Sequence, residues 1–274
     1  MKSKIFISVL VLGFISLNSY LFITAPEPLE KDVKTENYSY SVNDGFRLIA
    51  LINDEYRARY TKKIVGDGKK VGLNFDENWL DNEVEAGPLP ALFLRSTAAY
   101  MEKDPIQLGL YLGSDFPISE ANLLTGIQAE YFEQLRESGQ AQFFFDDDTD
   151  RNVAMFPDFA SAKACVSCHN QHQDSPKTDW KINDLMGATT WTYPYDSITT
   201  TELIDWVNLF VNGANHAYSS YLNKTETFED ADEISIGDKW PEHGKYLPTA
   251  SVFTDTVLSN VSVDLIKALI DESQ

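Results

Sequence analysis

Both cysteines of this chain lie in one five-residue motif, Cys165-Val-Ser-Cys-His169. The spacing C-x-x-C-H is the attachment pattern of c-type haem. Two thiols three positions apart can reach the two vinyl groups on one porphyrin edge, and the next side chain is an imidazole, a good ligand for iron in either oxidation state. The motif therefore predicts one covalent haem c, held by Cys165 and Cys168, with His169 as an iron ligand.

Zinc and a disulfide are the alternatives for the same cysteines. Cys165, Cys168 and His172, together with a remote His216 or His243, could supply four tetrahedral ligands. The sequence has no further cysteine and no H-x-x-x-H pattern for the second half of such a site. A disulfide would close only a four-residue loop and would stabilise little of the fold. Haem is favoured, and the other two readings stay open.

The second axial position of such a haem has no strong candidate in the sequence. Met101, Met155 and Met186 are the internal methionines, and Met/His ligation would raise the redox potential. Met155 is preferred because its predicted strand leads directly towards the haem segment. Plain core packing is the alternative for each of them, because methionine fills gaps in most cores. A vacant sixth site would let nitric oxide, carbon monoxide or oxygen bind.

The N-terminus is predicted to direct export. Lys2 and Lys4 precede an almost purely apolar run from Ile5 to Thr24, whose length suits one helix across ~30 Å of hydrocarbon. An uncleaved anchor over residues 1–25 is slightly favoured over a signal peptide, because no A-x-A cleavage pattern follows. The lysines should stay in the cytoplasm. We therefore expect a single-pass protein of the cell inner membrane with a periplasmic domain, or a periplasmic protein if the segment is cleaved.

The charge of the chain disfavours one class of partner. Lys and Arg number 22 against 42 Asp and Glu, a formal net charge of −20, which would repel nucleic acid. The acidity could steer a basic redox partner protein, although an evenly solvated acidic surface is the commoner explanation. No G-x-S-x-G or H-E-x-x-H pattern places a nucleophile or a base. We expect no enzyme activity apart from what a haem would supply.

Hydrophobic periodicity predicts an α+β fold. After a polar tether over residues 26–44, helices are predicted over 46–65, 91–103, 120–137, 201–222 and 263–270, and strands over 106–112, 142–145, 152–156 and 187–193. Little regular structure is expected between 161 and 186. This order predicts an antiparallel sheet flanked by helices, with the haem segment inserted before the last strand.

Several end points of these elements are also predicted. Glycines should end the first and third helices, near Gly66 and at Gly139, and Ser262 is a fair N-cap for the last helix. The aspartates between 146 and 150 resemble a calcium loop but lack its glycine and distal glutamate. They are interpreted as a solvated hairpin turn.

Four segments resemble a known bacterial domain family. They are Gly87-Pro-Leu-Pro-Ala-Leu-Phe-Leu-Arg95, Gly113-Ser-Asp-Phe-Pro-Ile118, Cys165-Val-Ser-Cys-His-Asn170, and Met186-Gly-Ala-Thr-Thr-Trp191 with Pro194. That family is a domain of unknown function with a PAS-like fold that binds c-type haem, found alone or outside the membrane ahead of kinase, cyclase and chemoreceptor modules. The resemblance covers residues 45–195 and leaves 196–274 as a helical C-terminal extension.

The resemblance implies a redox or diatomic-gas sensor with Cys165 and Cys168 in the thioethers and His169 as the proximal ligand. Arg95 is a candidate for contact with a haem propionate, with a surface ion pair as the alternative. Some members use a cysteine of the N-terminal helix as the opposite ligand, but residues 46–65 contain none here. No kinase, cyclase or chemoreceptor segment follows, so a signal would pass to a separate protein. A monohaem electron-transfer cytochrome is therefore the runner-up, and a zinc-stabilised binding module is the non-haem alternative.

Overall fold

The computed structural model of the protein describes residue 14 and residues 38–271, with no side-chain description from 263 onward. From Tyr38 the chain forms one compact unit. The predicted membrane segment, 1–25, and most of the predicted tether, 26–44, lie outside the described residues. Within the described part of the chain, no helix has the length and apolar character needed to cross a membrane.

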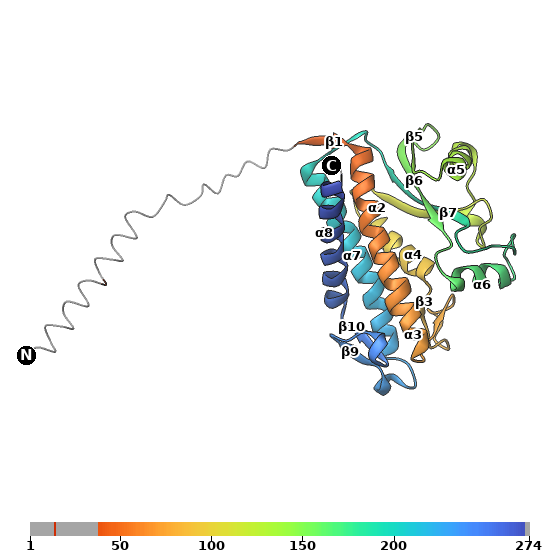
Figure 1. The fold of residues 1–274 in the computed structure, drawn as a ribbon, viewed down its shortest axis with the longest axis vertical. Coiled ribbons are helices and arrows are strands. Elements are labelled where there is room, and N and C mark those ends of the chain that lie inside the picture. The colour runs from red at the N-terminus through yellow and green to blue at the C-terminus, as the bar shows by residue number, and fades with distance from the viewer. Residues whose placement is uncertain (1–13, 15–37, 272–274) are drawn as a thin grey trace, which may run out of the picture. The chain divides into compact units, whose positions relative to one another are not determined.

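A four-stranded sheet lies at the centre of the α+β fold (Figure 1). It contains β4 (Gly109–Gly113), β7 (Leu185–Tyr193), β6 (Arg151–Phe159) and β5 (Gln142–Asp146), in the order β4-β7-β6-β5. All three neighbouring pairs are antiparallel. Strands β5 and β6 form the predicted hairpin, and its turn ends at Asp150 with a positive φ of 55°. The first of the four strands therefore lies beside the last.

The two faces of the sheet are covered by different helices. Successive side chains of a strand point to opposite faces. Ala154 and Trp191 face the main core, which is built with α2 (Val42–Arg59), α4 (Pro90–Met101), α7 (Thr200–Thr225) and α8 (Ala250–Asp271). Val153, Met155 and Ala188 face the other side and pack against α5 (Gly126–Ser138). As predicted, α5 ends at Gly139, which takes the left-handed conformation with φ 66°.

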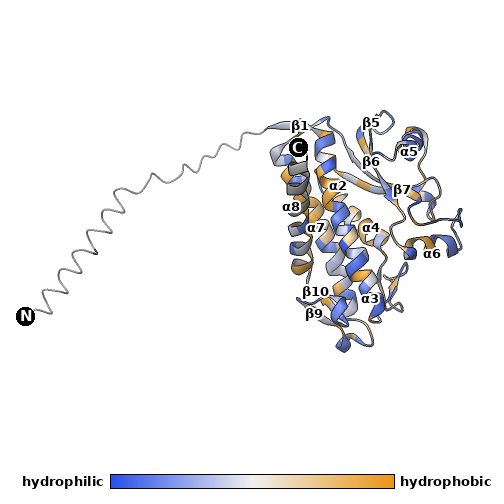
Figure 2. Cartoon of the chain, viewed as in Figure 1, coloured by the Kyte–Doolittle hydropathy of each residue, from blue (hydrophilic) through white to orange (hydrophobic). Residues whose placement is uncertain are grey.

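The helices of the main core pack closely. Figure 1 shows α2, α7 and α8 side by side, and Figure 2 shows both hydrophobic and hydrophilic residues on α2 and α7, as expected for helices with one buried face. Gly213 of α7 lies against α4, where an added Cβ would be 3.0 Å from the backbone oxygen of Thr97. The largest fully buried side chains are aromatic for the most part: Trp191, Trp206, Tyr56, Tyr60, Tyr218, Tyr221, Phe46, Phe93, Phe132, Phe210 and Phe253.

The first helix is longer than predicted. It starts at Val42, continues through a π-helical segment, η1 (Tyr60–Gly66), and ends after α3 (Asp67–Lys70). Gly66 does not end it. The side chains of Tyr60, Ile64 and Val65 are buried in the main core, and this packing stabilises the helical conformation through the glycines. A π-helical insertion often marks a functional region of a helix, and this one lies one turn beyond Arg57, which contacts the sheet.

The beginning of the compact unit also differs from the expected tether. Residues Ser39–Ser41 form β1, which pairs with β8 (Ser197–Thr199) in an antiparallel ladder. The backbone N–H of Thr200 donates to the oxygen of Tyr38 at 3.0 Å. The polar composition of residues 26–44 gave no sign of this pairing, because a three-residue strand is too short for a hydrophobic period.

The C-terminal residues are an integral part of the fold. Helix α7 begins with a capping box between Thr199 and Glu202, and its apolar face belongs to the main core. Helix α8 starts at Ala250, not at 263, so Ser262 lies inside the helix and donates to the oxygen of Leu258. The segment expected as an extension, 196–274, thus shares one compact unit with residues 38–195.

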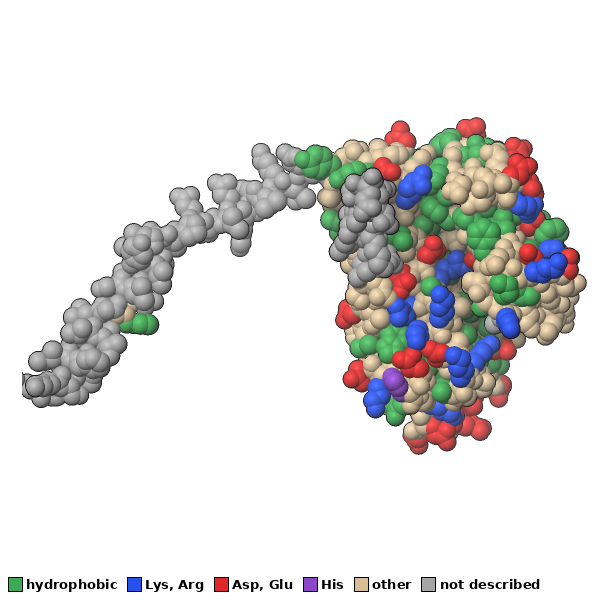
Figure 3. Space-filling model, in the orientation of Figure 1, with side chains coloured by type: hydrophobic (Ala, Val, Ile, Leu, Met, Phe, Trp, Pro, Cys, Tyr) green, Lys and Arg blue, Asp and Glu red, His purple; other side chains and the backbone are tan. Residues whose placement is uncertain are grey.

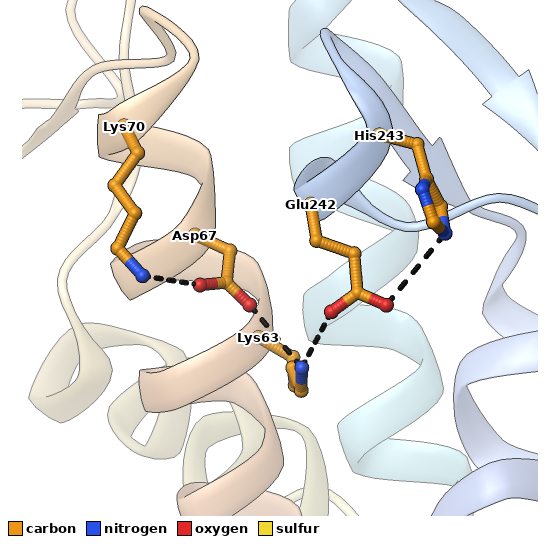
Figure 4. A network of polar contacts seen from close by, with 5 residues as sticks. All are labelled: Lys63, Asp67, Lys70, Glu242 and His243. Carbon is orange, nitrogen blue, oxygen red and sulfur yellow. Dashed lines mark hydrogen bonds and ion pairs between the residues drawn. The ribbon is translucent and has the colours of Figure 1, made fainter.

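Short elements complete the chain. Two parallel pairs join β2 (Phe75–Asp76) to β3 (Gly87–Pro88) and β9 (Ser235–Gly237) to β10 (Tyr246–Pro248). Single turns of 3-10 helix lie at η2 (Glu120–Asn122), η3 (Ala231–Glu233) and η4 (Pro241–His243). A charged network fastens η4 to the first helix: Lys63 Nζ lies 2.6 Å from Glu242 Oε2 and 3.4 Å from Asp67 Oδ2 (Figure 4).

Candidate functional site

The C-x-x-C-H motif lies on a helix, α6 (Lys163–Gln171), where little regular structure was predicted. The helix begins after Ala162, which is extended, and ends at His172, whose backbone N–H donates to the oxygen of Cys168 at 2.9 Å. Residues three and four positions apart share one face of a helix. Cys165, Cys168 and His169 therefore project from the same face.

Both cysteines are free thiols. Partial burial is the largest effect that raises the pKa of the Cys168 thiol, and the nearby Glu77 carboxylate raises it further. Lys69 acts in the opposite direction. A thiol with a raised pKa is mostly protonated at neutral pH and is a poor nucleophile. The Cys168 thiol is thus not activated as a nucleophile, and it is not joined to Cys165 in a disulfide.

His169 is held in its neutral form. Burial is the largest effect that lowers the pKa of the His169 imidazole, and the neighbouring His172 lowers it further. Asp158 acts in the opposite direction. Its Nδ1 is buried and has no hydrogen-bond partner among the described residues. A neutral imidazole is the form that binds iron. Two free thiols and a neutral, partly buried imidazole on one helix face fit the donor set of a c-type haem.

Asp158 links this site to the first helix. Arg57 of α2 donates to Asp158 Oδ2 at 2.7 Å and to Thr189 Oγ1 at 2.8 Å, so one guanidinium ties α2 to both β6 and β7. Asp158 is the charged group that favours protonation of His169. Sequence reasoning missed Arg57 and Asp158, since nothing in their local pattern connects residues 101 positions apart.

The loop after α6 is fixed by the residue that follows the motif. Asn170 Nδ2 donates to the oxygen of Trp180 at 3.0 Å, and the Trp180 N–H donates to Asn170 Oδ1 at 2.8 Å. His172 Nδ1 accepts from the Asp174 N–H at 3.1 Å, so its Nε2 carries the proton that it shares with Glu77 at 2.9 Å. Both nitrogens of His172 are thus occupied, and His172 and Glu77 lie near enough to act on His169 and Cys168.

The four ligands considered for zinc are not brought together. His216 lies on α7, with its ring 5.1 Å from that of Tyr100, and His243 lies on η4, 3.6 Å from Glu242. Among the residues that the structure describes, no group of three or more His, Cys, Asp or Glu side chains is arranged around a single metal ion.

Met155 and Arg95 lie apart from the helix face of the motif. Met155 is fully buried in the cluster under α5. Three positions separate it from Asp158 on β6, so the two side chains point to opposite faces of the sheet. Arg95 is exposed on α4 and lines a cavity of about 270 Å³ between α4 and β4, to which α6 contributes no residue.

If the predicted haem is attached to α6, replacing Met155 should leave its iron unchanged. We expect Met155→Leu to keep the absorption spectrum of the haem-loaded protein, because leucine fills the same cluster and no iron ligand is lost. A volume-conserving swap of this kind costs less than ~1.5 kcal/mol of unfolding free energy. Visible spectroscopy and chemical denaturation of the variant check both points, and a shifted charge-transfer or Soret band would restore Met155 as an axial ligand.

The site and fold define a class: an α+β domain that presents a C-x-x-C-H helix beside an antiparallel sheet. The model of the Tll0287-like family matches residues 35–194, which is more than half of the 274-residue chain. The chain belongs to this family. Comparisons with curated proteins and with solved structures gave no significant match.

Proposed function

We propose that this protein is a membrane-tethered, extracytoplasmic c-type haem protein that senses redox state or a diatomic gas. The observation that carries the proposal is the helix face of α6, where two free thiols and a neutral imidazole stand three and four positions apart. A haem attached there would supply a redox-active iron that can also bind small diatomic ligands.

Each residue of the site has a defined task in this proposal. Cys165 and Cys168 would hold the macrocycle through thioethers, in which each S–H adds across one vinyl group. His169 would bind the iron as neutral imidazole. Asp158, held by Arg57, places a negative charge near His169 and would stabilise positive charge that develops on that imidazole.

A PAS-like sheet is part of the same proposal. The four antiparallel strands with the first beside the last, the helical layer on one face and the separate helix α5 on the other are compatible with it. The membrane anchor over residues 1–25 also belongs to the proposal and rests on the apolar sequence alone.

Sensing is favoured over electron carriage by the contact between the site and the first helix. Arg57 joins α2 to Asp158, and α2 follows directly on β1, which continues the segment from the predicted anchor. A change of charge at His169 would therefore act on the C-terminal end of α2, and this helix runs back to β1 at the start of the compact unit. The electron-carrier alternative is supported by the acidic surface, which could dock a basic partner. In Figure 3, acidic side chains gather at the end of the molecule near β9, where Glu229, Asp232 and Glu233 are exposed.

Carbon monoxide distinguishes the two functions. A sensor with an open or weakly held sixth position is expected to bind carbon monoxide fully when the ferrous protein is titrated, with a saturable change of the Soret band. The gas-sensing form of the proposal fails if the ferrous iron binds no carbon monoxide while it exchanges electrons rapidly with a small redox mediator. That result would favour the carrier.

A further inference from the structure

A second candidate site lies on the α5 face of the sheet. A cavity of about 280 Å³ opens between β4, β6, β7 and the segment that leads into α5. A cavity of ~150 Å³ is enough for benzene, so a small organic molecule has room here. Polar and apolar groups both line the cavity, and the lining consists of Tyr111, Ala121, Asn122, Leu123, Leu124, Gln128, Thr149, Arg151 and Thr192.

Arg151 is the charged residue of this lining. Its Nε donates to Thr192 Oγ1 at 3.1 Å, and one Nη donates to the backbone oxygen of Gln107. Both acceptors are neutral, and no ion pair among the described residues includes Arg151. A guanidinium has five N–H donors, so three remain for a ligand.

The nearest carboxylate is committed elsewhere. Asp146 stands directly opposite Arg151 in the β5–β6 register, yet it pairs with neutral groups. Asp146 is buried, and its oxygens accept from Gln128 Nε2 and from the Asp148 N–H, each at 3.1 Å. Gln128 in turn accepts from the hydroxyl of Tyr111. This chain of hydrogen bonds holds the acid away from the guanidinium and leaves the cation facing the cavity.

The charges around the cavity also limit the ligand. Asp147, Asp148 and Asp150 are exposed in the hairpin turn beside Arg151, and their field opposes a second negative charge. An Arg–carboxylate pair is bidentate and among the stronger polar contacts in proteins. The single charge of Arg151 therefore favours a ligand with one carboxylate over a dicarboxylate.

We propose that this cavity binds a small organic monocarboxylate, anchored by the guanidinium of Arg151. Thr192 and Gln107 hold the guanidinium in place, and the apolar side chains of Leu123 and Leu124 cover the hydrocarbon part of the ligand. The site is independent of the C-x-x-C-H helix, and its failure would leave the haem proposal intact.

Calorimetric titration of the full chain in detergent tests the site, with sodium acetate, propionate and butyrate as probes at constant ionic strength. We expect at least one of them to bind and to raise the Tm by linkage, and propionamide, butyramide and succinate to bind roughly tenfold more weakly or not at all. Arg151→Gln should weaken monocarboxylate binding by roughly tenfold or more. Arg47→Gln, at an exposed position of α2, is the matched control and should bind as the unchanged protein does.

Ala121→Phe is a second variant, designed to obstruct the cavity with a bulky side chain while leaving Arg151 in place. It should abolish binding even if Arg151→Gln folds poorly, which circular dichroism would reveal. The proposal is overturned if no monocarboxylate gives heat or a Tm shift up to about 10 mM, a concentration that would nearly saturate a site with a Kd of ~1 mM. It is also overturned if the amides bind equally well, or if a folded Arg151→Gln retains full affinity.

Discussion

A chain that ends at residue 195 is expected not to fold, although it contains the whole family match. The removed segment supplies five large buried aromatic side chains to the main core: Trp206, Phe210, Tyr218, Tyr221 and Phe253. Burying one large apolar side chain contributes about 1.5–3 kcal/mol. Five of them amount to the whole net stability of a typical domain, ~5–15 kcal/mol. Circular dichroism and the dispersion of amide NMR signals would show an unfolded chain.

A point variant measures the same effect within a chain of full length. Phe210 is fully buried, with its ring 5.5 Å from that of Tyr56 on α2 and 5.8 Å from that of Trp191 on β7. Phe210→Ala should cost ~3–5 kcal/mol of unfolding free energy. Ile204→Ala on the same helix is the control, because that side chain is 53% exposed and should cost less than about 0.5 kcal/mol. Equal losses for both variants would mean that α7 is not part of the core.

Removing the imidazole of His169 is expected to change the haem spectrum more than any other single substitution in the site. Under the haem proposal, His169→Ala would leave the thioethers at Cys165 and Cys168 possible but would remove the protein ligand of the iron on that face. We expect a shifted Soret band and an altered potential, and we expect added imidazole to restore the spectrum by occupying the vacated position. Visible spectroscopy with an imidazole titration measures both changes.

His172→Ala is the matched control for that experiment. His172 lies three residues further on, and its two ring nitrogens are engaged with Glu77 and Asp174. Its removal should loosen the loop around Glu77 and leave the spectrum as it is. If His172→Ala shifts the spectrum and His169→Ala does not, the assignment of the proximal ligand is wrong.

Much of the sheet and two of the long helices could be predicted because their signals are local. The β5–β6 hairpin follows from two apolar runs around an aspartate-rich turn, α4 from prolines at a helix start, and α7 from helical spacing of large apolar residues. The start of α8 was missed because residues 250–262 are rich in threonine, serine and valine, which are modest helix formers. Burial of Phe253, Val257 and Val261 at a spacing of four residues overrides that tendency.

The residues of the candidate site could be picked out from the sequence, but their surroundings could not. The residues of the C-x-x-C-H motif can be recognised from their spacing in the sequence. Arg57 and Asp158 form their contact only because α2 packs against the sheet, which the sequence pattern does not indicate. The preference for Met155 rested on nearness in sequence to the motif. The alternation of β6 instead directs that side chain into the cluster under α5, and this follows only once the faces of the sheet are known.

The most direct test of the haem proposal is the intact mass of the mature protein, produced in a host with c-type haem maturation machinery. We predict a mass greater than that of the polypeptide by one haem, with a c-type pyridine haemochrome spectrum, and loss of both in the double variant Cys165→Ala/Cys168→Ala. A colourless protein whose mass equals that of the bare polypeptide would contradict the proposal.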